Sequence, residues 1–537
     1  MVTVMATAPA AIAATLDITT ASIADVQAAY ASSKVTAVQV TQAYLARIAA
    51  YDKQGPNINA VILLNPNALA DAKALDAERK AGKVRGPLHG VPIVLKDNVD
   101  TFDMQTTAGS QLLKGSIPSK DAFIAKKLRD AGAIIVAKVN LSEFAGSGGS
   151  VSGDKDPAVL LAGAVPNGFS SMGLQTRNPH DPTRGPSGSS GGTGAAIAAA
   201  FAQFGIGTDT GGSVRGPSSV NGIAGLKPTI GLLSRSGIVP LALTFDTAGP
   251  MARNVSDVAV ALGAMTGIDA SDAITATSKG RAESDYTKYL KPGALKGARI
   301  GIARDFLGKD EGVDAVIASS IETLKKLGAV VVDPVTYPDY LLDAKGPIYN
   351  LLVASEFKAQ LTDYLKTLKP GFPKSFDEIV AKANDPATGY ASPEKAYALK
   401  YTAKLALDLD DPVYLALKNQ QVPAVRAGME ALFAKYKIDA IVYPTSVRPA
   451  PLIVPAEPPK AALSTDSVTN LANESGFPDL IVPAGITKDG LPVAISFFGP
   501  AFSEGKLIGY GYDFEQATKA LRTPVTTPGL PSDKISY

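Results

Sequence analysis

The sequence predicts an α/β fold built as one large domain. Short apolar runs of strand length alternate with segments of helical periodicity through the middle and the end of the chain, which indicates a sheet whose strands are buried by helices. Hydrophobic residues make up 46% of the 537 residues and charged residues 19%, a composition typical of globular proteins. The length would allow several domains, but no glycine- and serine-rich linker divides the chain, and we expect one.

The first part of the chain combines a small, apolar start with helices. Residues 1–20 are expected to be a disordered start or the remnant of a secretory signal, because the run 11–14 (AIAA) resembles a small-residue cleavage site, although no Lys or Arg precedes it. Residues 17–85 are expected to be helical. Thr36 and Gln39 fit a capping box before apolar residues at helical spacing, and Asn67 is expected to cap a second helix that ends near Gly82.

The remaining elements alternate in type. Strands are predicted at residues 91–95, 133–139, 205–209, 297–303, 329–333, 439–443 and 491–499. Helices are predicted from about 195, over 314–327, from 427 toward the strand at 439, and over about 505–521. Between 338 and 425 the pattern changes to helices and polar loops, which we interpret as a helical excursion from the domain.

Composition excludes several functional classes. The chain has no cysteine, so disulfides, thiolate metal sites and cysteine nucleophiles are excluded. Its two histidines, His89 and His180, are too few for a typical histidine zinc site, and the search for a general base turns to lysine or a carboxylate. We therefore expect no metal and no cofactor. With 52 basic and 50 acidic residues, the chain gives no reason to expect nucleic acid as a partner, and no other segment approaches the ~20 apolar residues of a membrane span.

Three segments carry candidate chemistry. Residues 86–98 place Lys96 at the end of an apolar strand, where burial would lower its pKa and make it a neutral base; a lysine that reaches the surface is the alternative. Residues 185–194 form a glycine- and serine-rich turn before a helix, without the pattern of a phosphate-binding loop. Residues 207–215 end a strand in glycines followed by Ser213, and successive N–H groups of such a turn can converge on one oxygen.

In combination, these segments resemble the amidase signature family of serine hydrolases. The resemblance is carried by GPLHGVPIVLKDN, GPSGSSGGTGAA and GTDTGGSVR, and it extends to VTQAYLARI near the start and GFPDLIVPAG near the end. The QTRNP and PMAR runs make the chain most similar to bacterial peptide amidases and aryl acylamidases. The family fold implies a large twisted mixed β-sheet covered by helices on both faces, with an additional helical region. We expect a single domain over residues 21–537, with the signature core at about 86–255.

The resemblance also implies a role for each matching residue. Ser213 is implied to be the nucleophile, Ser189 the bridging serine, held on a cis peptide bond, and Lys96 the base. The implied oxyanion hole consists of the main-chain N–H groups of Thr210, Gly211, Gly212 and Ser213. The implied supporting residues are Ser190, Asp209 and Arg215.

This placement implies a stand-alone, metal-independent amidase that cuts the C–N bond of linear carboxylic amides through an acyl-enzyme. Its substrates would be small molecules: peptide amides, anilides or related acyl amides, with esters and urethanes as further candidates. Two alternatives are the A subunit of a tRNA-dependent amidotransferase, which needs partner subunits, and a catalytically silent binding protein of the same fold. We expect a monomer or homodimer. The sequence leaves the compartment open: cytoplasmic, or periplasmic or secreted if the start is a signal remnant.

Four further features have no assigned catalytic role. His89 is interpreted as a turn residue and His180 as a loop residue, because the family pattern has no catalytic histidine. Glu143 is either a structural carboxylate or part of the cleft wall. Residues 148–170 are longer than the corresponding family loop, so substrate choice does not follow from the resemblance.

Overall fold

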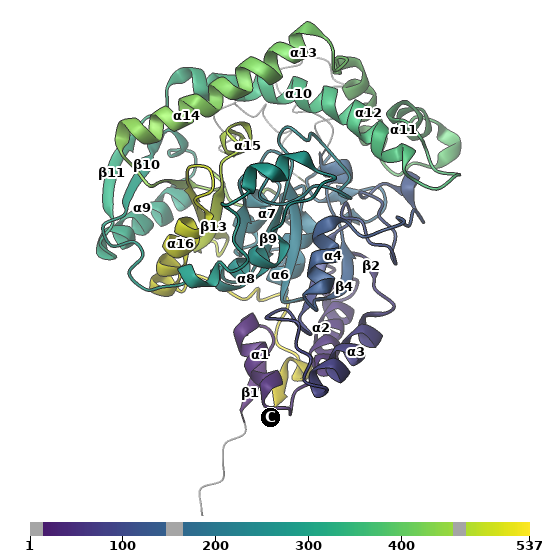
Figure 1. Cartoon of the computed structure of the whole chain (residues 1–537), viewed down its shortest axis with the longest axis vertical. Coiled ribbons are helices and arrows are strands. Elements are labelled where there is room, and N and C mark those ends of the chain that lie inside the picture. The colour runs from purple at the N-terminus through teal and green to yellow at the C-terminus, as the bar shows by residue number, and fades with distance from the viewer. Residues whose placement is uncertain (1–13, 147–164, 455–468) are drawn as a thin grey trace, which may run out of the picture.

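A mixed sheet of 11 strands forms the centre of the protein (Figure 1). The computed structural model describes residues 14–146, 165–454 and 469–537. The strand order across the sheet is β11-β10-β12-β14-β13-β8-β9-β7-β3-β4-β2. The strands are β2 Val61–Leu64, β3 Pro92–Lys96, β4 Ile134–Val139, β7 Phe204–Asp209, β8 Ala224–Lys227, β9 Thr247–Ala252, β10 Arg299–Ala303, β11 Val330–Val335, β12 Ala440–Pro444, β13 Asp479–Ile486 and β14 Pro492–Phe498.

The pairing of β3 with β7 decides where the predicted chemistry lies. β3 is parallel to both β4 and β7, and β7 is antiparallel to β9. Parallel neighbours bring their carboxyl ends to the same edge of the sheet. Lys96, which ends β3, and Asp209, which ends β7, therefore lie at one edge although more than a hundred residues separate them.

Helices cover both faces of the sheet. The helices are α1 Ile23–Ala31, α2 Ala37–Tyr51, α3 Ala68–Lys80, α4 Phe123–Asp130, α6 Gly191–Ala198, α7 Arg215–Val220, α8 Val255–Met265, α9 Glu311–Lys326, α10 Asp339–Lys366, α11 Phe376–Ala383, α12 Pro393–Leu405, α13 Pro412–Ala416, α14 Val422–Tyr436, α15 Asn470–Glu474 and α16 Glu504–Thr518. Helices α4, α8, α9 and α16 share one apolar core with the sheet, whereas α2, α3 and α6 enclose a second on the other face. This confirms the predicted α/β architecture.

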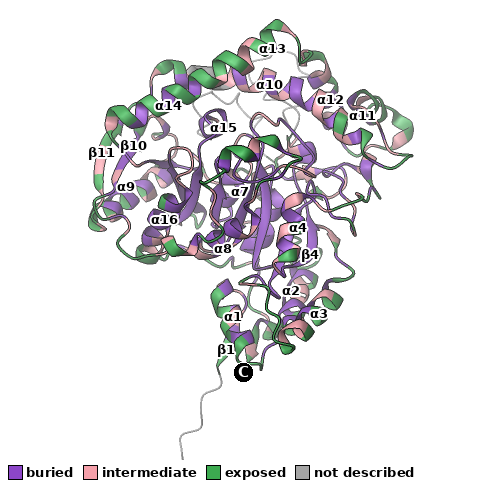
Figure 2. Cartoon of the chain, viewed as in Figure 1, coloured by how far each residue is buried: buried purple, intermediate pink, exposed green. Residues whose placement is uncertain are grey.

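Helices α10 to α14 form an arc over the core, which we call the helical arc. It is shown in green along the top of Figure 1. Helices α10 and α14 bury apolar residues against β12 and β14, while α10, α11 and α12 enclose a separate cluster that includes Phe144 and Phe357. The outer sides of α13 and α14 are exposed, and the strands at the centre of the sheet are buried (Figure 2). The arc is therefore packed against the sheet domain.

The start of the chain differs from its predicted disorder. Residues 1–13 lie outside the described residues, but β1, Thr15–Asp17, pairs antiparallel with β15, Lys534–Ser536. Leu16 and Ile18 are buried, so their apolar surface stabilises this order. The prediction of a disordered start is therefore wrong for residues 15–20.

Most predicted elements are confirmed, and the errors have local causes. Each of the predicted strands is present, with bounds that shift by a few residues at most. The capping box of Thr36 and Gln39 begins α2 as predicted, whereas Asn67 precedes α3 without a side-chain cap bond. Within the region expected to be helical, the short run Val61–Leu64 is the edge strand β2, paired with β4, because an available sheet edge outweighs a weak local preference. Strands β8, β9 and β13 were not predicted, since they are rich in glycine and alanine or contain proline.

Candidate active site

Lys96 is fully buried at the end of β3. Its Nζ lies 2.8 Å from Ser189 Oγ and 2.7 Å from Thr208 Oγ1. Within the described part of the chain it forms no ion pair, and the neighbouring Asp97 instead pairs with Lys138 at 3.1 Å. Burial lowers the pKa of Lys96 from 10.5 to about 7, against the opposing charge of Asp209 and Asp246. The lysine therefore exchanges its proton near neutral pH, as a general base should.

The serine pair lies where the glycine-rich turn enters α6. The Gly188–Ser189 peptide bond is cis, in agreement with the family pattern. Ser190 Oγ donates to Thr208 O at 3.1 Å, and the Ser190 N–H donates to Ser213 O, also at 3.1 Å. Ser190 thus ties Ser189 to both β7 and the turn that carries Ser213.

Glycine in this turn is required by close backbone contacts. A Cβ on Gly192 would lie 2.3 Å from the main-chain oxygen of Asn140 and 2.5 Å from its nitrogen. Real Cβ atoms do not approach backbone this closely. The glycine therefore allows the start of α6 to lie directly against the segment after β4.

Ser213 lies on a turn organised around the Asp209 carboxylate. Asp209 accepts hydrogen bonds from the main-chain N–H groups of Gly212, at 2.8 Å, and Val214, at 2.9 Å. Gly212 has a φ of 125°, a conformation that favours glycine. Ser213 itself is partly exposed, and its hydroxyl has no hydrogen bond to another described residue.

One member of the implied oxyanion hole already has a hydrogen-bond partner. The Gly212 N–H donates to Asp209 Oδ1 at 2.8 Å. The N–H groups of Thr210, Gly211 and Ser213 make no hydrogen bond with the rest of the described chain. These three remain the candidate donors.

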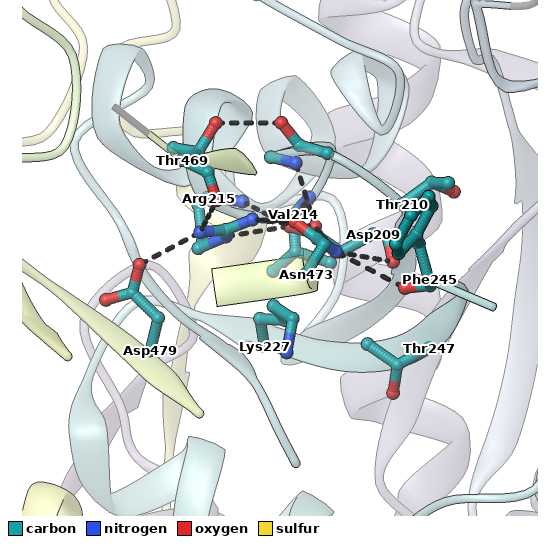
Figure 3. A network of polar contacts seen from close by, with 12 residues as sticks. Asp209, Thr210, Val214, Arg215, Lys227, Phe245, Thr247, Thr469, Asn473 and Asp479 are labelled. Carbon is teal, nitrogen blue, oxygen red and sulfur yellow. Dashed lines mark hydrogen bonds and ion pairs between the residues drawn. The ribbon is translucent and has the colours of Figure 1, made fainter. Parts of the chain in front are cut away.

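A buried ionic network braces the turn (Figure 3). Arg215 pairs with Asp209 at 3.0 Å and with Asp479, at the start of β13, at 3.1 Å. Arg215 Nη1 also donates to Thr469 O at 2.7 Å, and Asn473 Nδ2, on α15, donates to Asp209 Oδ1 at 2.9 Å. Burial alone would raise the pKa of Asp209, but the charge and hydrogen bonds of Arg215 outweigh it, so this pKa lies well below its usual range. Asp209 therefore stays ionised and the turn stays fixed.

The helical arc also reaches the site. Tyr349 on α10 stacks on Phe245 with ring centroids 5.4 Å apart, and its hydroxyl lies over Gly211, where it would be 2.4 Å from an added Cβ. Asp246, next to Phe245, accepts a hydrogen bond from Thr210 Oγ1 at 2.5 Å. A narrow pocket beside Lys96 is lined by both polar and apolar side chains, which include Asn98, Thr208, Thr210, Leu241 and Asp246.

The residues without an assigned catalytic role have structural contacts. His89 Nε2 lies 2.9 Å from Leu75 O, and His180 Nε2 lies 3.1 Å from Asn221 O. Burial lowers the pKa of both rings, to about 4 for His180. Glu143 is buried, accepts a hydrogen bond from the Ser171 N–H at 2.7 Å, and is bonded to the Tyr390 hydroxyl of the helical arc. It is thus a structural carboxylate that connects the two parts, and most of the 148–170 loop lies outside the described residues.

Sequence reasoning missed several residues of the site. Thr208 precedes Asp209 in a motif already singled out, and Asn98 follows Lys96 by two positions, so their proximity to the motif was an available signal. Asn473, Thr469 and Asp479 lie more than 250 residues after Asp209, and nothing local in the sequence connects them to it. No group of three or more potential metal ligands occurs among the described residues, and no helix there is long and apolar enough to cross a membrane.

Comparison with known proteins agrees with this arrangement. Residues 39–508 match the protein family described as Amidase. A probable amidase of Arabidopsis thaliana is 34% identical over 519 residues, which are 96% of this chain and 93% of that protein. The A subunit of the glutamyl-tRNA(Gln) amidotransferase of Thermoanaerobacter pseudethanolicus is 35% identical over 503 residues, 92% of this chain and 96% of that protein.

Solved structures give the same result. The native peptide amidase from Stenotrophomonas maltophilia is similar with a TM-score of 0.82 at 39% identity, and the match covers 94% of this chain and 98% of that one. The family match and the structural similarity together define a hydrolase of the amidase type. The chain belongs to the amidase signature family, and within that family it is similar to peptide amidases.

Proposed function

We propose that this protein hydrolyses the C–N bond of linear carboxylic amides, with Ser213 as nucleophile and Ser189 and Lys96 as its proton relay. The observation that carries the proposal is the 2.8 Å contact between Lys96 Nζ and Ser189 Oγ in fully buried surroundings. A serine is a weak nucleophile until a base takes its proton. A lysine that is partly neutral at pH 7 supplies that base.

The proposed reaction has two stages. Neutral Lys96 accepts the Ser189 proton while Ser189 accepts that of Ser213, and Ser213 Oγ forms a bond to the carbonyl carbon. The resulting oxyanion is bound by the remaining N–H donors of the turn, each of which typically contributes ~10²–10³ in rate. The relay then runs in reverse and protonates the leaving nitrogen as the C–N bond breaks. Water hydrolyses the acyl-enzyme by the same route.

Only the first contact of the proposed relay, between Lys96 and Ser189, is formed among the described residues. Ser189 Oγ is held by Lys96, whereas the Ser213 hydroxyl has no partner among the described side chains. The mechanism requires this hydroxyl to turn toward Ser189 as the carbonyl enters the oxyanion hole. Catalytic hydrogen bonds commonly tighten only when substrate is bound.

The substrate class is proposed from the surroundings of the turn. Aromatic and apolar side chains lie near the turn: Tyr349, stacked on Phe245, lies over Gly211, and Leu241 lines the neighbouring pocket. Such surroundings suit the apolar groups of peptide amides, anilides and related acyl amides. Similarity to peptide amidases supports the same class. Esters and urethanes place an equivalent carbonyl at Ser213 and are further candidate substrates.

Turnover by the purified single chain tests this function. We expect hydrolysis of at least one class in a panel of peptide amides, anilides, esters and carbamates. The Ser213→Ala variant should keep no more than about a hundredth of the wild-type rate. Labelling of Ser213 by a fluorophosphonate probe would separate an active hydrolase with an untested substrate from a silent binding protein. A Ser213→Ala variant with near-normal turnover would refute the nucleophile.

The second candidate function is that of an amidotransferase A subunit. The 35% identity to one such protein supports it. That function requires partner subunits, so a chain that is inert alone but gains glutaminase activity with them would favour this alternative. Activity of the isolated chain on simple amides would favour the stand-alone enzyme, as a monomer or homodimer.

A further inference from the structure

We propose that Asn98 and Thr208 form a positioning pair that holds Lys96 as the proton acceptor of Ser189. This inference rests on the proposed function and adds two residues to it. Thr208 Oγ1 lies 2.7 Å from Lys96 Nζ and 3.0 Å from Asn98 Nδ2. All three side chains are buried, with Asn98 exposed by 2% and Thr208 by 5%.

The direction of these hydrogen bonds decides the orientation of the lysine. A hydroxyl oxygen accepts at most two hydrogen bonds, and the amide nitrogen of asparagine can only donate. Asn98 therefore occupies one lone pair of Thr208 Oγ1 and leaves the other for an N–H of Lys96. Thr208 is thereby kept an acceptor toward the lysine.

A neutral lysine has two N–H donors and a single lone pair. One N–H is directed to Thr208 Oγ1, and the main-chain oxygen of Thr208 lies 3.5 Å from Nζ as a weaker second acceptor. The partner that remains is the Ser189 hydroxyl at 2.8 Å. The lone pair thus faces the proton that the relay has to remove.

The buried side-chain amide of Asn98 contacts Thr208 and is otherwise unsatisfied among the described residues. Its side chain makes one hydrogen bond within the described chain, the one to Thr208, and Asn98 Oδ1 is buried without a partner. A half-satisfied buried amide destabilises a fold. Such a group is expected where function requires it, so an apolar residue of similar size should preserve stability and impair catalysis.

The charged groups around Lys96 are the same in every variant tested. Asp209, at the end of β7, and Asp246, before β9, act on it through their charge, while Asp97 and Lys138 neutralise each other. Removing the Thr208 hydroxyl takes an acceptor from the ammonium form, so the acid limb of the pH profile should move to lower pH. Removing the Asn98 amide takes away a donor dipole aimed at Thr208, so the limb should move to higher pH.

The experiment compares kcat, KM, the pH profile of kcat/KM and the melting temperature on one anilide or ester substrate. Thr208→Val and Asn98→Leu should each lower kcat by about 10–100-fold with little change in KM, with limb shifts of opposite sign, and Asn98→Leu should melt no lower than the parent. Thr208→Ser keeps the hydroxyl and should recover most of the rate. Thr193→Val is the matched control, because Thr193 is also buried and its hydroxyl donates to Ile206 O, away from Lys96.

Two results would overturn the inference. Wild-type kcat and acid limb in both Thr208→Val and Asn98→Leu would show that neither residue positions the lysine. Lost activity that follows a lowered melting temperature, without a limb shift and without recovery in Thr208→Ser, would show a structural role instead. Ser213→Ala in the same series separates this from the parent proposal, since turnover in that variant would refute the relay itself.

Discussion

The acid limb of amide hydrolysis should report the protonation of Lys96. Its pKa of about 7 leaves about half of the lysine neutral at pH 7, whereas at its ordinary value of 10.5 only about one molecule in 3,000 would be neutral. Burial therefore raises the competent fraction by about a thousandfold at this pH. Below pH 7 the neutral fraction falls about tenfold per pH unit, so kcat/KM at pH 5 should be about a hundredth of its plateau.

Lys96→Ala provides the decisive comparison. This variant should lose most amide turnover and show no acid limb, and ester turnover should suffer less because an alcohol leaves more easily than an amine. The measurement is kcat/KM against pH for both proteins on an amide and its matching ester, since that parameter reports the free enzyme. An acid limb that survives unchanged in Lys96→Ala would assign the base to another group. His89 is a poor substitute, because its ring is engaged with the main chain of Leu75.

Three other perturbations test parts of the same argument. Gly192→Ala should destabilise the fold by about 3 kcal/mol, because its Cβ would lie 2.3 Å from main-chain oxygen; in urea unfolding, the control Gly346→Ala, with open space around it, should cost nothing. Arg215→Met leaves Asp209 and Asp479 buried without their cation, so unfolding free energy should fall by about 3–5 kcal/mol, and an unchanged midpoint would contradict the bracing role. Dialysis against EDTA should leave turnover intact, since the chain has no cysteine and two histidines, each bonded to a main-chain oxygen; recovery by added zinc after a loss would count against this.

The fold class was predictable from the amino-acid sequence, and the candidate site residues were named from it through their resemblance to the amidase signature family. Apolar runs at strand spacing predicted β3, β4, β7, β10, β11, β12 and β14 because burial on both faces leaves a continuous hydrophobic pattern. Lys96 stood out because a charged residue ended such a run, and the serines stood out because glycines surrounded them. These signals depend only on residues that are close together in the sequence, so they can be read without the structure.

Which groups act together, and which do not, depends on the three-dimensional arrangement. The Gly212 N–H donates to Asp209, and a run of glycines does not show which of its N–H groups already have a partner. Arg215 is paired across more than 250 residues with Asp479, and Tyr349 reaches Gly211 from the helical arc. Hydrogen bonds and ion pairs depend on direction over about 3 Å, and that precision arises when the sheet brings distant segments to one edge, which no periodicity along the chain records.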